Sequence, residues 1–557
     1  MTSHAAAAPS SASTTSWRST LGSTWRWQIA FVALCLFAFG AAAPLADPDL
    51  PIHLATGEWI VRHHAVPFTE LWAWTRAGQP YYAYSWAVET VYYLVLAYAG
   101  PLGLHAVQGI TTVALAASIA LLGWAAGWRA WTTIAVALIH VLVASSVVPF
   151  LRPQSILLIV TPCIWALVLR ARDATALRWE LPVLMALSAL AANSHLLFPV
   201  TAAPCVLLLV QPPTDRKRWL LIPGAIIVGW LLTPYALHWQ DVFALNFAPN
   251  ALNFAPNAMS GPPSPIAEFR PGFSAAVASG MSSLLLCCGL ALVPWAVAAR
   301  SRPVERLVYG ALWIAGLVLF ALSLRGLAVW WLLIIPTAAL AIEALPVPTL
   351  PALITAQRAA VLIIFPMLTL SVIDQARDPR VHDGTVITRR LPSISARSME
   401  PIAEWLDCNV QRTVPSRLIT TFNYGSYIAW RLPYLSESID GRTIFADSVA
   451  RSETYLPPNR PAINYPPWRT ADLAIVPFSV PLAAVLDTAT GWRRVAITSQ
   501  LDGKPTMIGL WVTRSWWSRA GLSPIPSYTV PLYHTLTPAT ACARPDSTSG
   551  VGGRETP

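Results

Sequence analysis

Long apolar runs, separated by short polar segments, fill most of the first 375 residues of the chain. A helix needs about 20 apolar residues to cross the hydrocarbon core of a bilayer. The pattern therefore predicts an α-helical polytopic membrane protein. About eleven spans are expected, at residues 27–45, 103–123, 131–149, 155–170, 181–195, 197–211, 219–236, 275–297, 306–324, 327–346 and 357–374.

After residue 375 the apolar runs become short and are bounded by turn residues, as in a small α/β domain. Helices are predicted at 398–406 and 481–486, and Asn423-Tyr424-Gly425 is predicted to form a turn between two strands. The predicted strands lie at 417–422, 427–430, 472–477, 492–497 and 506–512. The expected domains are a disordered cytoplasmic tail (1–26), a transmembrane domain (27–375), an extracytoplasmic α/β domain (376–542) and a disordered tail (543–557).

Composition supports the membrane assignment. Of the 557 residues, 55% are hydrophobic and 11% are charged, whereas soluble proteins carry roughly 25% charged residues. The formal net charge of +10 comes mostly from arginines in loops. We attribute it to topology and membrane contact and expect no nucleic-acid partner. Basic loops mark the cytoplasmic side, which indicates a cytoplasmic N-terminus and an extracytoplasmic C-terminal domain.

Two long loops are expected on the outer side, at residues 46–102 and 237–274. The first contains Trp86 to Ala99, which is apolar and rich in aromatic residues. Such a segment can either cross the bilayer or lie in its interface, where aromatic rings are favoured. We interpret it as an interfacial or re-entrant helix, because an additional span would reverse the predicted side of the loops that follow.

An acidic motif directly follows the first apolar run. Asp47, Asp49 and His53 lie where a membrane helix would leave the bilayer, and ionisable groups so close to hydrocarbon are costly without a partner or a function. Either aspartate could simply cap a helix beginning near Leu50, with Pro51 in its first turn. Both aspartates could also serve catalysis, as a general base or as oxygen ligands of Mg²⁺ or Mn²⁺.

Further polar residues are predicted at the same membrane face. Arginines there could hold a phosphate group with their planar guanidinium, and Glu89 is a candidate catalytic acid in an otherwise apolar helix. Each also has a structural explanation: Arg152 and Arg325 could anchor helices at the interface, and Asn193 and His195 could bond between helices. The candidate substrate-binding residues are His53, Arg152, Asn193, His195, Glu268, Arg270 and Arg325.

Two features of the C-terminal region have structural interpretations. Cys408 and Cys542 are the cysteines outside the apolar runs, and in an extracytoplasmic domain they could form a disulfide. Asp440-Gly441-Arg442 is interpreted as a turn with a salt bridge.

These motifs, in this order, resemble a family. The chain is similar to the GT-C superfamily of multi-pass glycosyltransferases, and in particular to a bacterial branch related to the dolichyl-phosphate-mannose-protein mannosyltransferases. The resemblance covers residues 45 to 515 or so. It is carried by Asp47-Pro48-Asp49, His53 to Gly57, Val66-Pro67, Trp86 to Glu89, Arg152-Pro153-Gln154, Asn193-Ser194-His195, Ile266-Ala267-Glu268, Asn423 to Tyr427, Ile439 to Arg442, and Gly491-Trp492.

The resemblance implies transfer of a sugar, with inversion, from a polyprenyl-phosphate donor to a glycan, lipid or protein acceptor outside the bacterial inner membrane. By family position Asp47 would be the base, supported by Asp49, with the sugar between the two outer loops. The chain departs from the branch at Pro51-Ile52, where an aromatic residue is common. It also departs before the tenth span, where the branch often has a more basic cluster and this chain has Arg325 alone. The alternatives are a transporter or flippase of a lipid-linked glycan, or a non-catalytic membrane scaffold.

Overall fold

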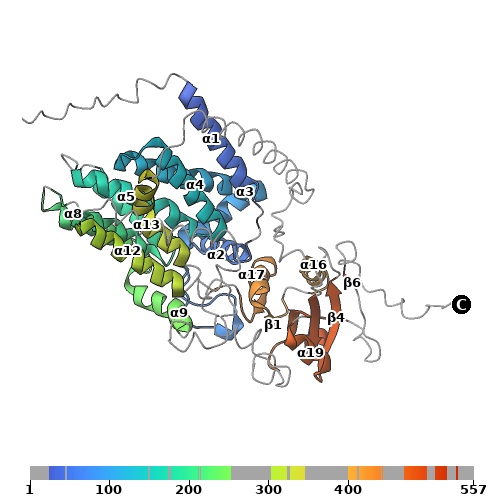
Figure 1. The fold of residues 1–557 in the computed structure, drawn as a ribbon. Helices are drawn as coiled ribbons and strands as arrows, with labels where there is room; N and C mark the ends of the chain where they lie inside the picture. Colours follow the sequence, from blue (N-terminus) through green and yellow to red (C-terminus); the bar gives the residue numbers. More distant parts are fainter. Residues whose placement is uncertain are drawn as a thin grey trace, which may run out of the picture.

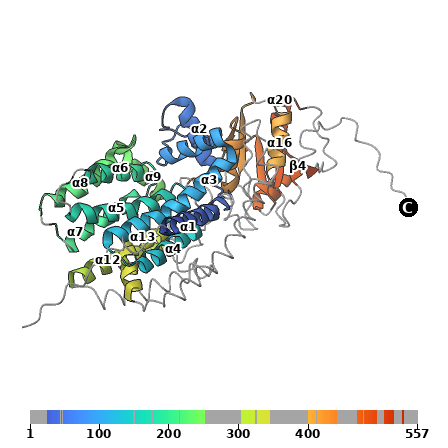
Figure 2. The same ribbon diagram turned by 90° about the horizontal axis from the view of Figure 1, so that it is seen from above.

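The computed structural model describes most of the helical region and the core of the C-terminal domain. The described residues are 24–43, 45, 47–147, 151–173, 177, 179–210, 212–213, 215–251, 303–322, 326–344, 399–410, 413–440, 442, 469–478, 480–498, 508–522 and 535–536. A helical part and a sheet-containing part are linked by α2 and α17 (Figures 1 and 2).

The helical part follows the apolar pattern of the sequence. Its helices pack around a core of large buried side chains that includes Trp165, Phe320 and Trp330. The helices are α1 (Thr24–Ala41), α2 (Leu50–His63), η1 (Trp74–Arg76), α3 (Trp86–Ala126), α4 (Ala130–Val147), α5 (Ser155–Asp173), α6 (Glu180–Ala192), η2 (Phe198–Cys205), α7 (Val206–Val210), α8 (Arg218–Leu231), η3 (Ala236–His238), α9 (Trp239–Ala251), α12 (Pro303–Leu322) and α13 (Gly326–Ala344).

Nine of the predicted spans coincide with described helices or pairs of helices, and the spans at 275–297 and 357–374 lie outside the described residues. Within the part that is described, three helices are long and apolar enough to cross a membrane, or four if the bent pair α8 and α9 counts as one span. Several other apolar helices are shorter. The chain is thus a helical membrane protein, and the number of spans stays a prediction.

The segment 86–99 forms a helix that a kink at Gly100 (φ 64°, ψ −166°) separates from the apolar helix beginning at Pro101; the two share the label α3. Its expected place in the membrane interface stays a prediction. Glycine readily adopts a positive φ, and proline removes a helical N–H donor. The chain can therefore bend at this point between two apolar segments.

The C-terminal part contains a sheet of six strands among the described residues, in the order β2-β1-β3-β5-β4-β6. β1 pairs in parallel with β2 and β3, while β5 pairs antiparallel with β3 and β4. The elements are α16 (Glu400–Asn409), β1 (Ser416–Thr420), α17 (Phe422–Arg431), β2 (Leu435–Glu437), β3 (Leu473–Pro477), α19 (Pro481–Thr488), β4 (Trp492–Thr498), β5 (Ile508–Thr513), α20 (Arg514–Arg519) and β6 (Thr535–Leu536).

One sequence-based assignment in this domain is wrong. Residues 422–431 form the helix α17, not a turn followed by a strand. The apolar positions Tyr424, Tyr427 and Ile428 belong to one buried cluster, and their spacing of three and four residues is that of a helix face. Arg431 at the end of the helix is also held by Glu400 of α16, with 3.1 Å between Nε and Oε1.

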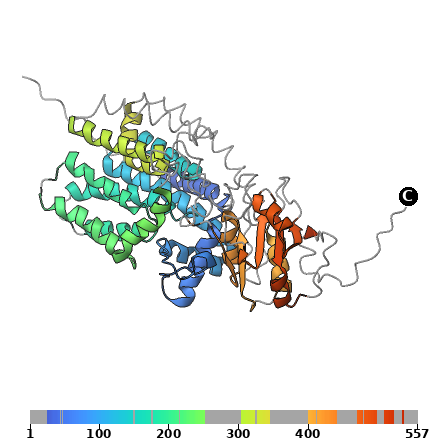
Figure 3. The same cartoon turned by 90° about the horizontal axis from the view of Figure 1, so that it is seen from below.

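The loop between α2 and α3, residues 64–85, docks the helical part onto the sheet. We call it the docking loop; it forms a parallel bridge from Ala73 to Glu437 beside β2. The Trp74 indole N–H donates to the Leu418 carbonyl (3.1 Å), and the Thr75 hydroxyl donates to the Ser438 carbonyl (2.6 Å). Figure 3 shows this blue segment beside the orange strands.

A buried charge cluster completes this junction. Arg442 Nη2 donates to Glu70 Oε1 (2.7 Å), and its Nε donates to Asp440 (2.8 Å). Burial tends to raise the pKa of Glu70, but Arg442 and the N–H groups of Trp72 and Ala73 hold that pKa below its ordinary value. Glu437 is fully buried nearby; burial, with the charge of Asp440, raises its pKa well above the ordinary carboxyl value.

The contact between α2 and α3 depends on a glycine. A Cβ atom added at Gly57 would lie 2.1 Å from the carbonyl oxygen of Glu89, so the two backbones approach too closely for any side chain. We expect Gly57→Ala to destabilise the protein by about 1–3 kcal/mol, the usual cost of overpacking. The melting temperature of the purified protein in detergent would measure this. Gly224→Ala, where nothing lies within 4 Å, is the control and should not lower it.

Because the pKa of the buried Glu437 carboxyl is raised, we expect the protein to lose stability as the pH rises above the ordinary carboxyl pKa. Because its pKa is raised in the folded protein, its contribution is fully present below the unfolded carboxyl pKa and is lost as the pH rises through the folded pKa. We expect Glu437→Gln to melt close to wild type at about pH 4, near the unfolded carboxyl pKa, and increasingly above wild type as the pH rises to about 9. If the melting temperature fell equally in both proteins as the pH rose, a neutral Glu437 would be contradicted.

Candidate functional site

The acidic motif is built around one arginine. Arg152, which directly precedes α5, donates from Nε to Asp47 Oδ2 (2.9 Å) and from Nη2 to Asp47 Oδ1 (3.1 Å). Its Nη2 also lies 3.1 Å from Asp49 Oδ2. Asp47 is 5% exposed, and the Arg152 side chain is 12% exposed. The cluster therefore ties the chain after α1 to the beginning of α5.

This pairing argues against helix capping as the explanation for the aspartates, and their catalytic role stays a prediction. Asp49 occupies the N-cap position of α2, but its side chain makes no capping hydrogen bond. Its backbone N–H instead donates to Asp47 Oδ1 (3.1 Å), and Pro51 lies in the first turn as expected. Both carboxylates thus form ion pairs with Arg152 and do not cap the helix.

A second buried pair lies one helical turn further along α2. His53 Nδ1 is 2.8 Å from Glu89 Oε1 in the first turn of α3, and Glu89 is 4% exposed. Burial tends to lower the pKa of His53, but the hydrogen bond to Glu89 and the charges of Glu89, Asp49 and Asp47 together raise it. A raised pKa favours the imidazolium form, and thus an ion pair with Glu89.

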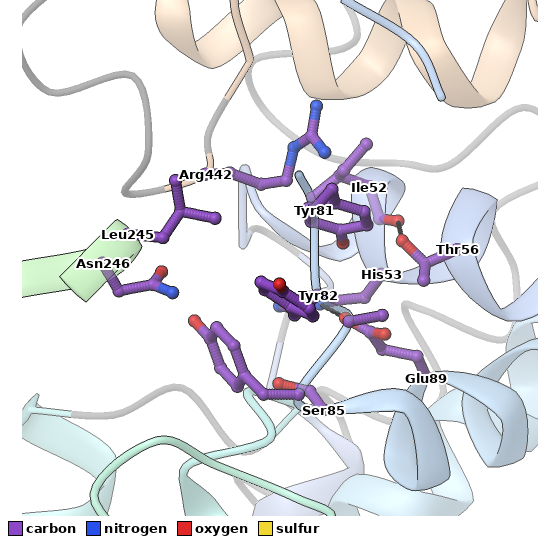
Figure 4. A pocket seen from close by; sticks show the side chains of 12 residues that line it. Ile52, His53, Thr56, Tyr81, Tyr82, Ser85, Glu89, Leu245, Asn246 and Arg442 are labelled. Atoms are coloured by element: carbon purple, nitrogen blue, oxygen red, sulfur yellow. Dashed lines mark hydrogen bonds and ion pairs between the residues drawn. The ribbon is translucent and has the colours of Figure 1, made fainter. Parts of the chain in front are cut away.

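These side chains line a small pocket that is open to the surface. Three parts of the chain meet there: α2 with the docking loop and the beginning of α3, the middle of α9, and Arg442 of the C-terminal domain (Figure 4). The lining combines tyrosine rings with a carboxylate, an imidazole, hydroxyls and an amide. It consists of Ile52, His53, Thr56, Tyr81, Tyr82, Ala83, Tyr84, Ser85, Glu89, Leu245, Asn246 and Arg442.

Asn193 and His195 have structural contacts. Asn193 accepts a hydrogen bond from the Trp86 indole (2.6 Å) and donates to the carbonyls of Ala189 and Leu232 (2.8 Å each). It thereby joins α3, α6 and the end of α8. His195 Nδ1 accepts from the Leu197 N–H (3.1 Å). Neither residue lines the pocket. Asn193 makes bonds between helices, as its structural explanation expects, whereas the bond between His195 and Leu197 is local.

Several candidates lie outside the described residues, namely Glu268, Arg270, Arg325 and Cys542. Cys408 is disulfide-bonded, and its pairing with Cys542 stays a prediction. The structure brings together Asp47, Asp49 and Arg152, and separately His53 and Glu89.

Sequence reasoning missed the residues that complete the pocket. Arg442 was interpreted only as part of a salt bridge; it makes that bridge with Asp440, but it also stacks over the Tyr81 ring at 4.5 Å from the centroid. Asn246 reaches the pocket from α9, and Tyr82 from the docking loop. The tyrosine-rich run at 81–84 was the available signal, because tyrosine combines an apolar ring with a polar hydroxyl.

The predicted cation site does not fit this arrangement. Arg152 already supplies positive charge to both Asp47 and Asp49. Among the described residues, no group of three His, Cys, Asp or Glu side chains could hold a metal ion. We therefore derive no step through a cation.

No protein-family model matches the sequence, and no curated protein matches it either. Several solved structures do match in fold. The oligosaccharyltransferase of Archaeoglobus fulgidus in its apo form aligns with a TM-score of 0.50 and 11% identity, covering 81% of this chain and 69% of that one.

Two further structures align at slightly lower scores. ArnT from Cupriavidus metallidurans in the apo state has a TM-score of 0.48 and 15% identity, covering 89% of this chain and 99% of that one. The arabinofuranosyltransferase AftD from Mycobacteria, as the R1389S mutant, has a TM-score of 0.49 and 16% identity, covering 88% of this chain. The alignment spans 42% of the length of AftD. The chain thus shares the fold of the archaeal oligosaccharyltransferase.

Proposed function

We propose that the protein is a membrane glycosyltransferase that moves a sugar from a polyprenyl-phosphate donor to an acceptor outside the inner membrane. The observation that carries the proposal is the pocket lined by tyrosines and by the buried pair His53–Glu89, placed where the membrane helices meet the C-terminal domain. Sugars are bound by aromatic faces and by hydrogen bonds to their hydroxyls. The fold shared with the archaeal oligosaccharyltransferase supports the same class of reaction.

In the proposed reaction the acceptor hydroxyl attacks the anomeric carbon with inversion, and the polyprenyl phosphate leaves. A carboxylate serves as general base for the hydroxyl. Asp47 is the candidate from the sequence, and Glu89 is the other buried acid beside the site. Positive charge near the leaving phosphate stabilises the transition state. Arg152 and Arg325 are the proposed donors of that charge.

The proposed topology follows the positive-inside rule. The N-terminus would face the cytoplasm, and the pocket and the C-terminal domain would face outward. The acceptor would be a glycan, lipid or protein that approaches from this side. In this arrangement Arg442 lets the C-terminal domain form one wall of the pocket, so the domain would help to position the acceptor.

A transporter or flippase of a lipid-linked glycan is a second candidate. The observation that favours it is the bend of 93° between α8 and α9, since transporters often use broken helices at their binding sites. This bend also brings Leu245 and Asn246 of α9 to the pocket, as a transferase would require. A transporter would change the side on which a glycolipid accumulates without changing its sugar content.

The test is a glycan and glycolipid profile of native cells carrying wild type, a gene deletion, or Asp47→Asn at matched membrane levels. We expect the deletion to lose one sugar addition while its acceptor accumulates. Asp47→Asn should lower that addition at least tenfold, because it removes a carboxylate and leaves Arg152 without its bidentate partner. Asp241→Asn on α9, whose side chain is 63% exposed, is the matched control.

Two outcomes would contradict the proposal. A deletion that leaves every glycan and lipid-linked sugar intact would exclude the transferase. A deletion phenotype with a normal Asp47→Asn variant would favour the transporter or the non-catalytic scaffold.

A further inference from the structure

Glu89 and Asp47, the two candidate bases, differ in the hydrogen-bond partners of their carboxylate oxygens. Both Asp47 oxygens accept from Arg152. Glu89 Oε1 is bonded to His53, whereas Glu89 Oε2 is buried and has no hydrogen-bond partner in the described part of the chain. A buried carboxylate oxygen without a partner costs free energy, and such groups are typical of sites that a ligand completes.

The location of Glu89 points to the ligand. Glu89 lines the pocket together with Ser85, Thr56 and Asn246, whereas Asp47 does not line it. Tyr81, Tyr82 and Tyr84 add aromatic faces. A sugar matches this lining, because it can donate a hydroxyl to the carboxylate and pack its ring against the tyrosines.

We propose that Glu89 is the general base of the transfer and that His53 is a positioning residue that orients it. This inference rests on the proposed function. The acceptor O–H gives its proton to Glu89 Oε2 while the acceptor oxygen bonds to the anomeric carbon of the donor sugar. The bond from that carbon to the phosphate oxygen breaks, and its electron pair leaves with the polyprenyl phosphate. Asp47 then keeps Arg152 in place and takes no proton.

The surroundings of Glu89 agree with this division of roles. The titratable groups that face it are His53 of α2, Tyr81 of the docking loop and Tyr235 between α8 and α9, with Asp47 and Asp49 acting on His53. Burial raises the pKa of Tyr81, so its phenol stays neutral. His53, 2.8 Å from Glu89 Oε1, is therefore the group among these that can carry a positive charge beside Glu89.

The test uses the purified full-length protein and detergent-solubilised membranes of the deletion strain, which contain the endogenous donor and the accumulated acceptor. Product formation is followed by mass spectrometry as a function of pH. We expect Glu89→Gln to lower the rate at least about 100-fold, within the usual range for loss of a general base. Glu89→Asp, which keeps a shorter carboxylate, should retain a measurable part of the rate.

Matched variants separate this role from a structural one. Glu58→Gln removes a buried acid of α2 that pairs with Arg62 at 2.6 Å, away from the pocket lining, and should leave the rate unchanged. His53→Gln should move the acidic limb of the pH profile to higher pH, because Glu89 loses its positive partner. Asp47→Asn should lower the rate but leave that limb in place.

The inference is overturned if Glu89→Gln stays within tenfold of wild type while Asp47→Asn loses activity; the transferase itself would then stand. It is also overturned if His53→Gln lowers the rate without moving the acidic limb. If wild type forms no product from these membranes, the proposed function fails instead. The three results are distinguishable in one series of assays.

Discussion

The Arg152 guanidinium, shared by Asp47 and Asp49, is the interaction on which the site depends. It fixes the chain between α1 and α2 against the beginning of α5, and thus sets the position of α2. His53 and Gly57 follow on that helix, so the contact with Glu89 and the close approach to α3 depend on the same anchor. Breaking a buried ion pair from one side costs about 3–5 kcal/mol, because it leaves the partner charge uncompensated.

The second constraint is the junction with the C-terminal domain. The docking loop contributes backbone and side-chain bonds to the sheet, and Arg442 returns from the sheet to bond Glu70 and stack over Tyr81. Trp430 of α17 is buried in the same cluster as Leu50 and Leu54 of α2. The pocket is therefore not a property of the helical part alone, since Arg442 of the other part forms one of its walls.

The two acid clusters near α2 have different physical characters. Around Arg152 two carboxylates share one guanidinium, and these ion pairs hold the backbone. Around Glu89 one carboxylate oxygen is bonded to His53, while the other has no hydrogen-bond partner among the described residues. Since reorganisation during reaction is costly, a base oriented in advance by a fixed partner is better suited to catalysis than one that must first leave an arginine.

The sequence by itself determined the helical membrane class, because apolar runs of the right length must form helices in a bilayer. It also placed most strands of the C-terminal domain, and it singled out Asp47, Asp49, His53, Arg152 and Glu89 as unusual charges. The prediction from local periodicity was wrong at α17, because polar and aromatic residues made its helical face hard to recognise. Only the tertiary structure decided which charges pair, since Asp47 and Arg152 are 105 residues apart, and Glu70 and Arg442 are 372 apart. No local pattern can encode such contacts, because they arise from packing between distant helices and the sheet.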